Sequence, residues 1–266
     1  LMRYSLPPPC QKRGVGAGSL HWLASCLLFL SLSLLVACPA KAQMDLRIQS
    51  HLALATAYLH ANLLTLAMQE TEQVLVVSPQ LPEGLGLKAV IYQKQGRLAL
   101  AGRFFQQASL LAPQNAQIAH NWGVFECEQG LYESAFLRFE LAQRHSEGLE
   151  RDKSLWIWGV CLLQNQQWAA ADLKMSGPFQ RQPSFISEAL DLASLKIQLG
   201  RDAEAEKILD KVNDSPSVSA QSLWLSVQLA QRQNQAVKKN HWGKMLGLLF
   251  SNSVQWRAYQ AEVSHD

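Results

Sequence analysis

The sequence predicts an all-α fold that is built from stacked pairs of helices. Three observations support this prediction: the spacing of apolar residues, the glycines that separate apolar stretches, and the recurrence of both at a fixed interval. Apolar residues that recur three or four positions apart lie on one face of a helix. No stretch of the 266 residues shows the apolar/polar alternation that is typical of β-strands.

Residues 83–113 contain one such helix pair. Ala89 and Tyr92 are three positions apart, so they share a face of the first helix, which Gly96 interrupts. The second helix has an apolar stripe at spacings of four and three, and Pro113 ends that helix. The stripe is formed by Ala101, Phe105 and Ala108.

The same pattern recurs on both sides at an interval of 34 residues. The turn glycine Gly96 corresponds to Gly130 in the next pair. Pro113, which ends this pair, corresponds to Pro79, which ends the pair before it. This interval, with small residues where two helices meet, is typical of the tetratricopeptide repeat (TPR). We expect these residues to form the contacts between helices: Ala55, Tyr58, Ala67, Ala89, Tyr92, Ala101, Phe105, Ala108, Trp122, Gly123, Ala135, Phe139, Ala142, Trp158, Gly159, Ala171, Ala193 and Ala205.

The sequence therefore predicts a superhelical array of about six TPR helix–turn–helix repeats in residues 48–266. The register shifts by two residues before the fourth repeat, and we expect Gly177 and Pro178 to cut short its second helix. The sixth repeat is degenerate, as terminal repeats often are. The expected repeats are 48–81, 82–115, 116–149, 152–185, 186–219 and 220–250, followed by a C-terminal cap.

The N-terminal segment has the pattern of an export signal. Arg3, Lys12 and Arg13 precede an apolar run over residues 20–36, and the run ends in the residues LVAC, which resemble a bacterial lipobox. We predict a lipoprotein signal peptide over residues 1–37, lipidation of Cys38, and a tether over residues 38–47. Ordinary signal cleavage after Ala42 and an uncleaved membrane anchor are the alternatives.

The cysteine count agrees with export to an oxidising compartment. Cys10 and Cys26 precede the predicted cleavage site, and Cys38 carries the lipid, so Cys127 and Cys161 are left as a pair. Both lie on first helices of adjacent repeats at nearly the same height, which predicts a disulfide. The alternative is a pair of buried free thiols.

The sequence contains no motif for catalysis or metal binding. The net charge is only +3. The seven histidines are scattered and do not have the spacing of zinc ligands. The sequence also lacks the motif of a phosphate-binding loop. His120 and Cys127 are two helical turns apart, about 10 Å, which is too far for a catalytic pair. We expect no enzyme activity, no cofactor, no small-molecule substrate and no nucleic acid partner.

The first helices of TPR arrays line a concave face, and here that face is apolar with a few amides. Only Asn121 fits a clamp for a C-terminal carboxylate, so an apolar segment of a protein partner suits this face better. The expected partner-binding groove consists of Leu52, Thr56, Leu59, Val90, Gln93, His120, Asn121, Val124, Trp156, Val160, Leu163 and Trp224, extended by Ser194, Ile197 and Gln228. For Trp156 and Trp224, burial in the core is the open alternative.

Residues 120–130, HNWGVFECEQG, together with Gly159-Val160-Cys161 and the late SLWL of residues 222–225, resemble the type IV pilus biogenesis and stability lipoproteins, the PilF/PilW family. The resemblance covers residues 47–259, although Phe250-Ser251 stands where the family has Phe-Pro. It implies a pilotin, a TPR protein held by its lipid on the periplasmic face of the outer membrane, which helps the secretin subunit of the pilus machine to localise and assemble. Pro39, which is not the Asp that commonly retains lipoproteins in the inner membrane, favours that location. A generic periplasmic TPR lipoprotein for cell-wall or outer-membrane assembly is the alternative function.

Overall fold

The computed structural model describes residues 42–181 and 186–263. The signal segment and Cys38 lie outside the described residues, so their predictions stay predictions. The described residues form helices joined by short turns and contain no strand. They divide into two compact units, one ending at Val77 and one beginning at Ser78. The predicted all-α repeat array is confirmed.

The first unit is a single helix pair. Residues 42–60 form its first helix, and α2 (Leu64–Val77) forms its second. Asn62 makes the turn between them with φ of +57°, a left-handed conformation that asparagine tolerates better than most residues. Ala55 and Ala67 are both fully buried.

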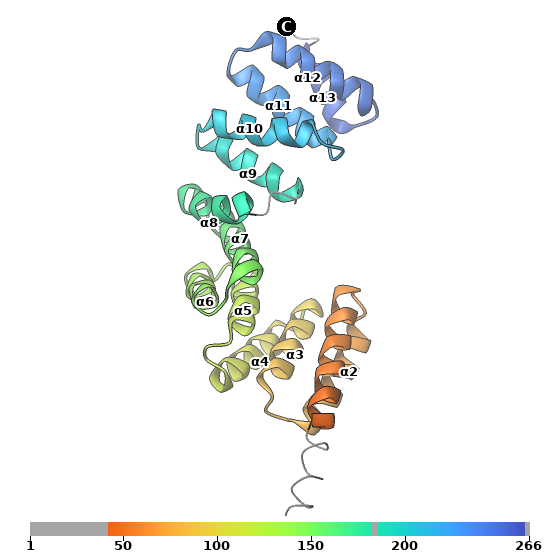
Figure 1. Ribbon diagram of the computed structural model, residues 1–266, viewed down its shortest axis with the longest axis vertical. Coiled ribbons are helices and arrows are strands. Elements are labelled where there is room, and N and C mark those ends of the chain that lie inside the picture. Colours follow the sequence, from red (N-terminus) through yellow and green to blue (C-terminus); the bar gives the residue numbers. More distant parts are fainter. Residues whose placement is uncertain (1–41, 182–185, 264–266) are drawn as a thin grey trace, which may run out of the picture. The chain divides into compact units, whose positions relative to one another are not determined.

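The second unit stacks five helix pairs and a final helix, and Figure 1 shows the succession of the pairs. The pairs are α3 (Pro82–Lys94) with α4 (Leu98–Leu111), α5 (Ala116–Glu128) with α6 (Tyr132–Arg144), α7 (Gly148–Gln164) with α8 (Trp168–Arg181), α9 (Ile186–Gln198) with α10 (Asp202–Asn213), and α11 (Ala220–Arg232) with α12 (Ala236–Leu249). The last helix, α13 (Val254–Val263), lies against α11 and α12.

Each pair turns through one residue with positive φ. Gly96, Gly130 and Gly200 take this place in three pairs, with φ of +72° to +73°. In the remaining two pairs of this unit, Gln166 and Asn234 adopt φ of +57° and +58°. Glycine is favoured here because it lacks the Cβ that makes this conformation costly, and the other two residues bear that cost.

The core follows the small-against-large pattern expected from the sequence. Phe105 and Phe139 are fully buried, and a Cβ built on Gly123 would lie 3.0 Å from Cε1 of Phe139. The two helices of the third repeat therefore approach as closely as a glycine allows. Most of the positions expected at helix contacts are buried, while Tyr58, Tyr92, Trp122 and Trp158 are partly exposed.

The prediction for the second helix of the fourth repeat is wrong. Instead of ending at Gly177, α8 runs through Pro178 to Arg181. Proline removes one backbone hydrogen bond, and here it does so in the last turn, where few bonds follow it. The Pro178 side chain is also buried, which offsets part of that loss. The first helix of this repeat, α7, begins at Gly148, four residues before the expected start.

Candidate partner-binding surface

Three valines recur at one position of successive first helices. Val90, Val124 and Val160 each follow the buried small residue of their helix, Ala89, Gly123 or Gly159, and all three are partly exposed. The backbones of α3, α5 and α7 lie within 8 Å of each other in succession, so these positions form a continuous strip. A strip of half-exposed aliphatic side chains can bury more apolar area against a partner.

Polar side chains along this strip bond from one first helix to the next. Gln93 of α3 donates to Glu128 of α5 over 2.7 Å, and Nδ1 of His120 lies 3.1 Å from the hydroxyl of Ser154 on α7. These contacts hold neighbouring first helices in register and leave only part of each amide or imidazole for a partner.

Asn121 bonds within its own helix. Its Oδ1 accepts a 3.0 Å hydrogen bond from Nε2 of Gln117, one turn earlier on α5. The side chain is partly exposed, and its amide NH₂ is not used in that bond. Asn121 can therefore donate to a partner's carbonyl without breaking the helix contact.

Burial lowers the pKa of His120, because the protonated imidazole would lose solvation at this site. Glu150 opposes this effect, and Lys153 adds to it. The ring of His120 also meets the ring of Phe139 edge-on, with centroids 6.0 Å apart. The neutral imidazole is thus favoured, and it serves as a hydrogen-bonding link between α5 and α7.

Trp156 does not lie on the surface as an anchor for a partner. Only 7% of it is exposed, and it belongs to a core cluster with Met175 and Leu192. The reason is a change in stacking: within the described residues the backbones of α7 and α9 do not come within 8 Å, unlike the other neighbouring first helices of the second unit. Large side chains, Trp156 and Leu195 among them, fill the wider space between these repeats. Trp156 is therefore removed from the expected groove.

The other groove positions are partly or fully accessible. Trp224 is partly exposed and packs against the cluster of Leu223, Val227 and Leu246. Leu52, Thr56 and Leu59 lie on the first helix of the separate N-terminal unit. The strip that the structure brings together is therefore the one formed by α3, α5 and α7. Its members are Val90, Gln93, His120, Asn121, Val124, Val160 and Leu163, and we call it the first-helix strip.

Cys127 and Cys161 face each other across α5 and α7. Their Cα atoms are 6.0 Å apart, and the structure joins their sulfur atoms. That distance lies within the range a disulfide requires. The bridge would fasten the two first helices that carry Val124 and Val160.

A series of cation–π contacts was not expected from the sequence. The guanidinium of Arg138 lies 3.6 Å from the ring centre of Trp122, and Nζ of Lys174 lies 3.5 Å from that of Trp158. In the second repeat the roles are exchanged, with Nζ of Lys88 4.9 Å from the ring of Phe104. Alignment of the repeats would reveal the series, because the partners occupy equivalent positions on first and second helices.

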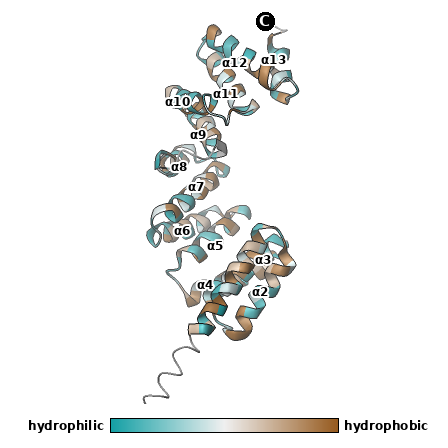
Figure 2. Cartoon of the chain, turned by 45° about the vertical axis from the view of Figure 1, so that its right-hand side comes forward, coloured by the Kyte–Doolittle hydropathy of each residue, from teal (hydrophilic) through white to brown (hydrophobic). Residues whose placement is uncertain are grey.

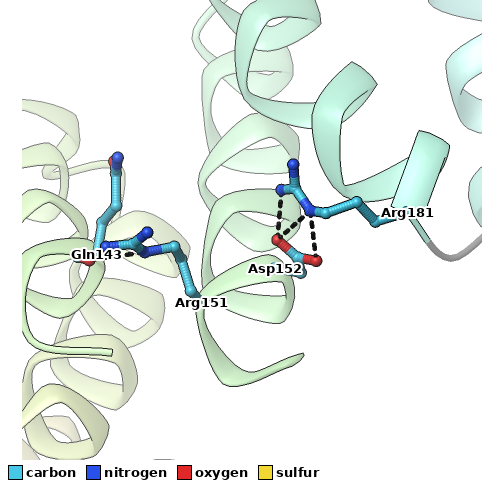
Figure 3. A network of polar contacts seen from close by, with 4 residues as sticks. All are labelled: Gln143, Arg151, Asp152 and Arg181. Atoms are coloured by element: carbon cyan, nitrogen blue, oxygen red, sulfur yellow. Dashed lines mark hydrogen bonds and ion pairs between the residues drawn. The ribbon is translucent and has the colours of Figure 1, made fainter. Parts of the chain in front are cut away.

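Two more polar features stabilise the fourth repeat. Figure 3 shows Arg181, at the end of α8, turned toward Asp152 of α7, with Nε 2.9 Å from Oδ2. This hydrogen-bonded ion pair lowers the pKa of Asp152. Figure 3 also shows Arg151, whose Nε donates to the backbone carbonyl of Gln143 over 3.2 Å. The start of α7 is thereby fixed to both helices beside it.

A buried ionic cluster joins the fourth and fifth repeats. Nζ of Lys196 lies 2.8 Å from Asp172 and 2.7 Å from Glu204, and Arg201 also bonds to Asp172. Both Asp172 and Lys196 are only 5% exposed at the side chain. Since an unpaired charge at such a site would be costly, Asp172 and Lys196 depend on each other. Arg201 and Glu204, by contrast, are about half exposed.

A metal site and a membrane-spanning helix each have requirements that the described residues do not meet. No group of three His, Cys, Asp or Glu side chains is placed to hold a metal ion in residues 42–181 and 186–263. An open surface depression is lined by residues 78–82, which carry no charged side chain. In the same part of the chain, no helix has the length and apolar character needed to cross a bilayer.

An all-α array of helix pairs, with small residues at their contacts and an apolar strip on the first helices, defines a TPR protein. No family model matches the sequence. Among known proteins the chain is similar to the type IV pilus assembly protein PilF of Pseudomonas aeruginosa, with 24% identity over 213 residues, 80% of this chain and 84% of that protein. The resemblance to the type IV pilus TPR proteins is therefore confirmed.

Solved structures agree with this fold. The structure of Pseudomonas aeruginosa PilF has a TM-score of 0.69 at 24% identity and covers 82% of this chain and 99% of its own. PilW, a type IV pilus biogenesis factor, has a TM-score of 0.65 at 22% identity, and the match covers 81% of this chain and 97% of PilW. YrrB, a TPR protein with an unusual peptide-binding site, has a TM-score of 0.62 at 12% identity, and the match covers 72% of this chain and 97% of YrrB.

Proposed function

We propose that this protein is a lipid-anchored TPR scaffold that binds the secretin subunit of a type IV pilus machine and promotes its localisation and assembly. The observation that carries the proposal is the similarity to PilF over most of both chains. The first-helix strip supports it, because a continuous row of half-exposed apolar positions suits a segment of a protein partner. Such a scaffold needs no catalytic group.

The anchor is part of this proposal. Cys38 follows a lipobox-like run, and acyl chains on it would hold the protein on the periplasmic face of the outer membrane. The mass of the mature N-terminus tests the anchor. A diacylated terminus at Cys38 supports it, and an unmodified terminus at Gln43 would show ordinary signal cleavage instead.

Binding of a purified secretin subunit tests the function directly. We expect the double substitution Asn121→Ala, Val160→Ser to weaken that binding at least about tenfold, since both side chains lie on the strip. The matched control is Leu173→Ser on the second helix α8, which changes an 81% exposed leucine away from the strip and should leave binding unchanged. Equal thermal unfolding of the variants excludes a folding defect. Wild-type binding by the strip variant would move the site off the first helices.

A further inference from the structure

The positive charge of this protein is concentrated in its last repeat. Residues 215–263 contain five Lys and Arg residues and a single acidic residue, Glu262. Residues 42–214, by contrast, contain fifteen basic and nineteen acidic residues. The C-terminal repeat, formed by α11, α12 and α13, is therefore cationic on a chain whose remaining described part is acidic.

The second helix of this repeat, α12, carries apolar residues on two opposite sides. One side holds Gly243 and Leu246, which are buried toward the repeat core. The other side holds Val237, 84% exposed, and Leu248, 78% exposed. Figure 2 shows this mixture as brown and teal segments along α12. A core-facing stripe explains the first set but not the second, because nothing in the described residues covers the second.

The outward side of α12 forms one stripe that is both aliphatic and basic. Val237, His241, Lys244 and Leu248 follow each other at spacings of four, three and four, so they share a helix face. All four are exposed. Val254, at the start of α13, adds another 68% exposed aliphatic side chain to the same repeat.

Some of the positive charge in this repeat is neutralised within the chain, and some is not. Lys238 pairs with Glu206 of α10, and Arg232 pairs with Asp202. Lys244 and Arg257 are exposed and make no ion pair within residues 42–181 and 186–263. Their charges are therefore available to an external anion.

We propose that the outward face of α12, with the start of α13, binds the headgroup region of a membrane that contains anionic phospholipid. Exposed aliphatic side chains interleaved with lysine on one side of a helix suit the boundary between headgroups and acyl chains. Protein partners are instead anchored mainly by Trp, Tyr and Arg, and the exposed stripe of α12 presents Val237 and Leu248 as its apolar side chains. The membrane contact goes beyond the scaffold function and beyond the predicted acyl anchor, and it needs neither.

Lipid vesicles test this proposal without an acyl anchor. The probe is the chain from residue 39 onward, which retains every described residue, in flotation with vesicles of phosphatidylethanolamine and phosphatidylglycerol or of phosphatidylcholine alone. Each basic residue near an anionic surface contributes about 1 kcal/mol, or about fivefold in affinity. We therefore expect binding to anionic vesicles that is roughly 25-fold stronger than binding to neutral ones and that falls as salt is raised.

Two pairs of substitutions separate the charges from the apolar contact. Lys244→Gln with Arg257→Gln should reduce binding to anionic vesicles about 25-fold and leave binding to neutral vesicles unchanged. Val237→Ser with Leu248→Ser should reduce binding to both kinds of vesicle, by about tenfold or more. Leu173→Ser on α8 removes an equally exposed leucine and is the matched control, with no expected loss. Circular dichroism confirms that each variant is folded.

Three results would overturn the proposal. They are a lack of binding to anionic vesicles, equal binding to anionic and neutral vesicles by the wild-type chain, and wild-type affinity in both double variants. If the same variants bind vesicles normally but lose a purified secretin subunit, the face is a protein-binding surface and the membrane proposal fails.

Discussion

Single glycine positions decide whether the helix pairs close. Gly123 on α5 lies against the ring of Phe139, whereas a Cβ on Gly102 of α4 would meet the Phe125 ring at an ordinary 3.7 Å. We expect Gly123→Leu to lower the free energy of unfolding by about 1–3 kcal/mol, because the added side chain has no space beside Phe139. Gly102→Leu is the matched control and should cost much less, since that site is partly exposed.

Thermal or denaturant unfolding of the two glycine variants measures the difference. Equal stability of Gly123→Leu and Gly102→Leu would show that α5 and α6 do not approach as described.

His120 should make stability depend on pH. Because burial lowers its pKa in the folded state, the unfolded chain takes up the proton first as the pH falls. The contribution of a neutral His120 to the free energy of unfolding is therefore fully present above the pKa of the unfolded state, about 6.5, and is lost as the pH falls below that value. The free energy of unfolding of the wild type should drop more between pH 7.5 and 5.5 than that of His120→Gln.

The groups around His120 define the control for this experiment. Glu150 and Lys153 affect its charge, and Ser154 and Phe139 contact its ring. Ser154→Ala removes the hydrogen bond but keeps the imidazole, so its pH dependence should persist. Parallel curves for the wild type and His120→Gln would contradict a lowered pKa at this residue.

At the scale of helices, the link between Cys127 and Cys161 should fasten α5 to α7. The bridge closes a loop with a sequence separation of 34, for which the chain-entropy model gives about 3–4 kcal/mol at most. We expect the Cys127→Ser, Cys161→Ser double variant to unfold at a lower temperature than the oxidised wild type. A reducing agent should lower the unfolding temperature of the wild type toward that of the variant.

Thiol titration of the denatured, unreduced mature chain measures the bridge itself. The described residues contain two cysteines, Cys127 and Cys161, so two free thiols from them would refute the bridge. The double variant in the same reducing agent is the control, because its stability should not respond.

The helix pairs could be predicted from the sequence because their signals are local. Small residues, turn glycines and the 34-residue interval depend only on neighbours along the chain. The sequence could not decide between burial and exposure of Trp156, since the outcome depends on how far α7 lies from α9. Nor could the sequence predict the Lys196–Asp172 pair, which joins α8 and α9 and has no repeat equivalent in the pattern that defines the fold.

The helical conformation at Pro178 also depends on tertiary packing and could not be predicted from the local sequence. Proline lowers the propensity for helix, but tertiary packing of its ring outweighs that preference when the cost is a single bond near a helix end. The cation–π series was within reach of the sequence, because Arg138 and Lys174 lie 36 residues apart, like Trp122 and Trp158.

For the whole molecule, repeat architecture explains how the proposed scaffold can be built from helix pairs alone. Each repeat adds one first helix, and the first helices α3, α5 and α7 lie side by side and form one strip. On that strip Val90, Val124 and Val160 are partly exposed, and the proposed function assigns them to the contact with a partner. Its strength as a binding surface depends on several residues together rather than on one buried tryptophan.

The most direct test of the scaffold proposal is the amount of assembled secretin in cells that lack this protein and are complemented with it. Envelope blotting should show heat-resistant secretin multimers with the wild-type chain. The Asn121→Ala, Val160→Ser variant should yield mostly monomeric secretin at equal protein level, and Leu173→Ser should restore multimers fully. Full multimers in cells without the protein, or with the strip variant alone, would contradict the account.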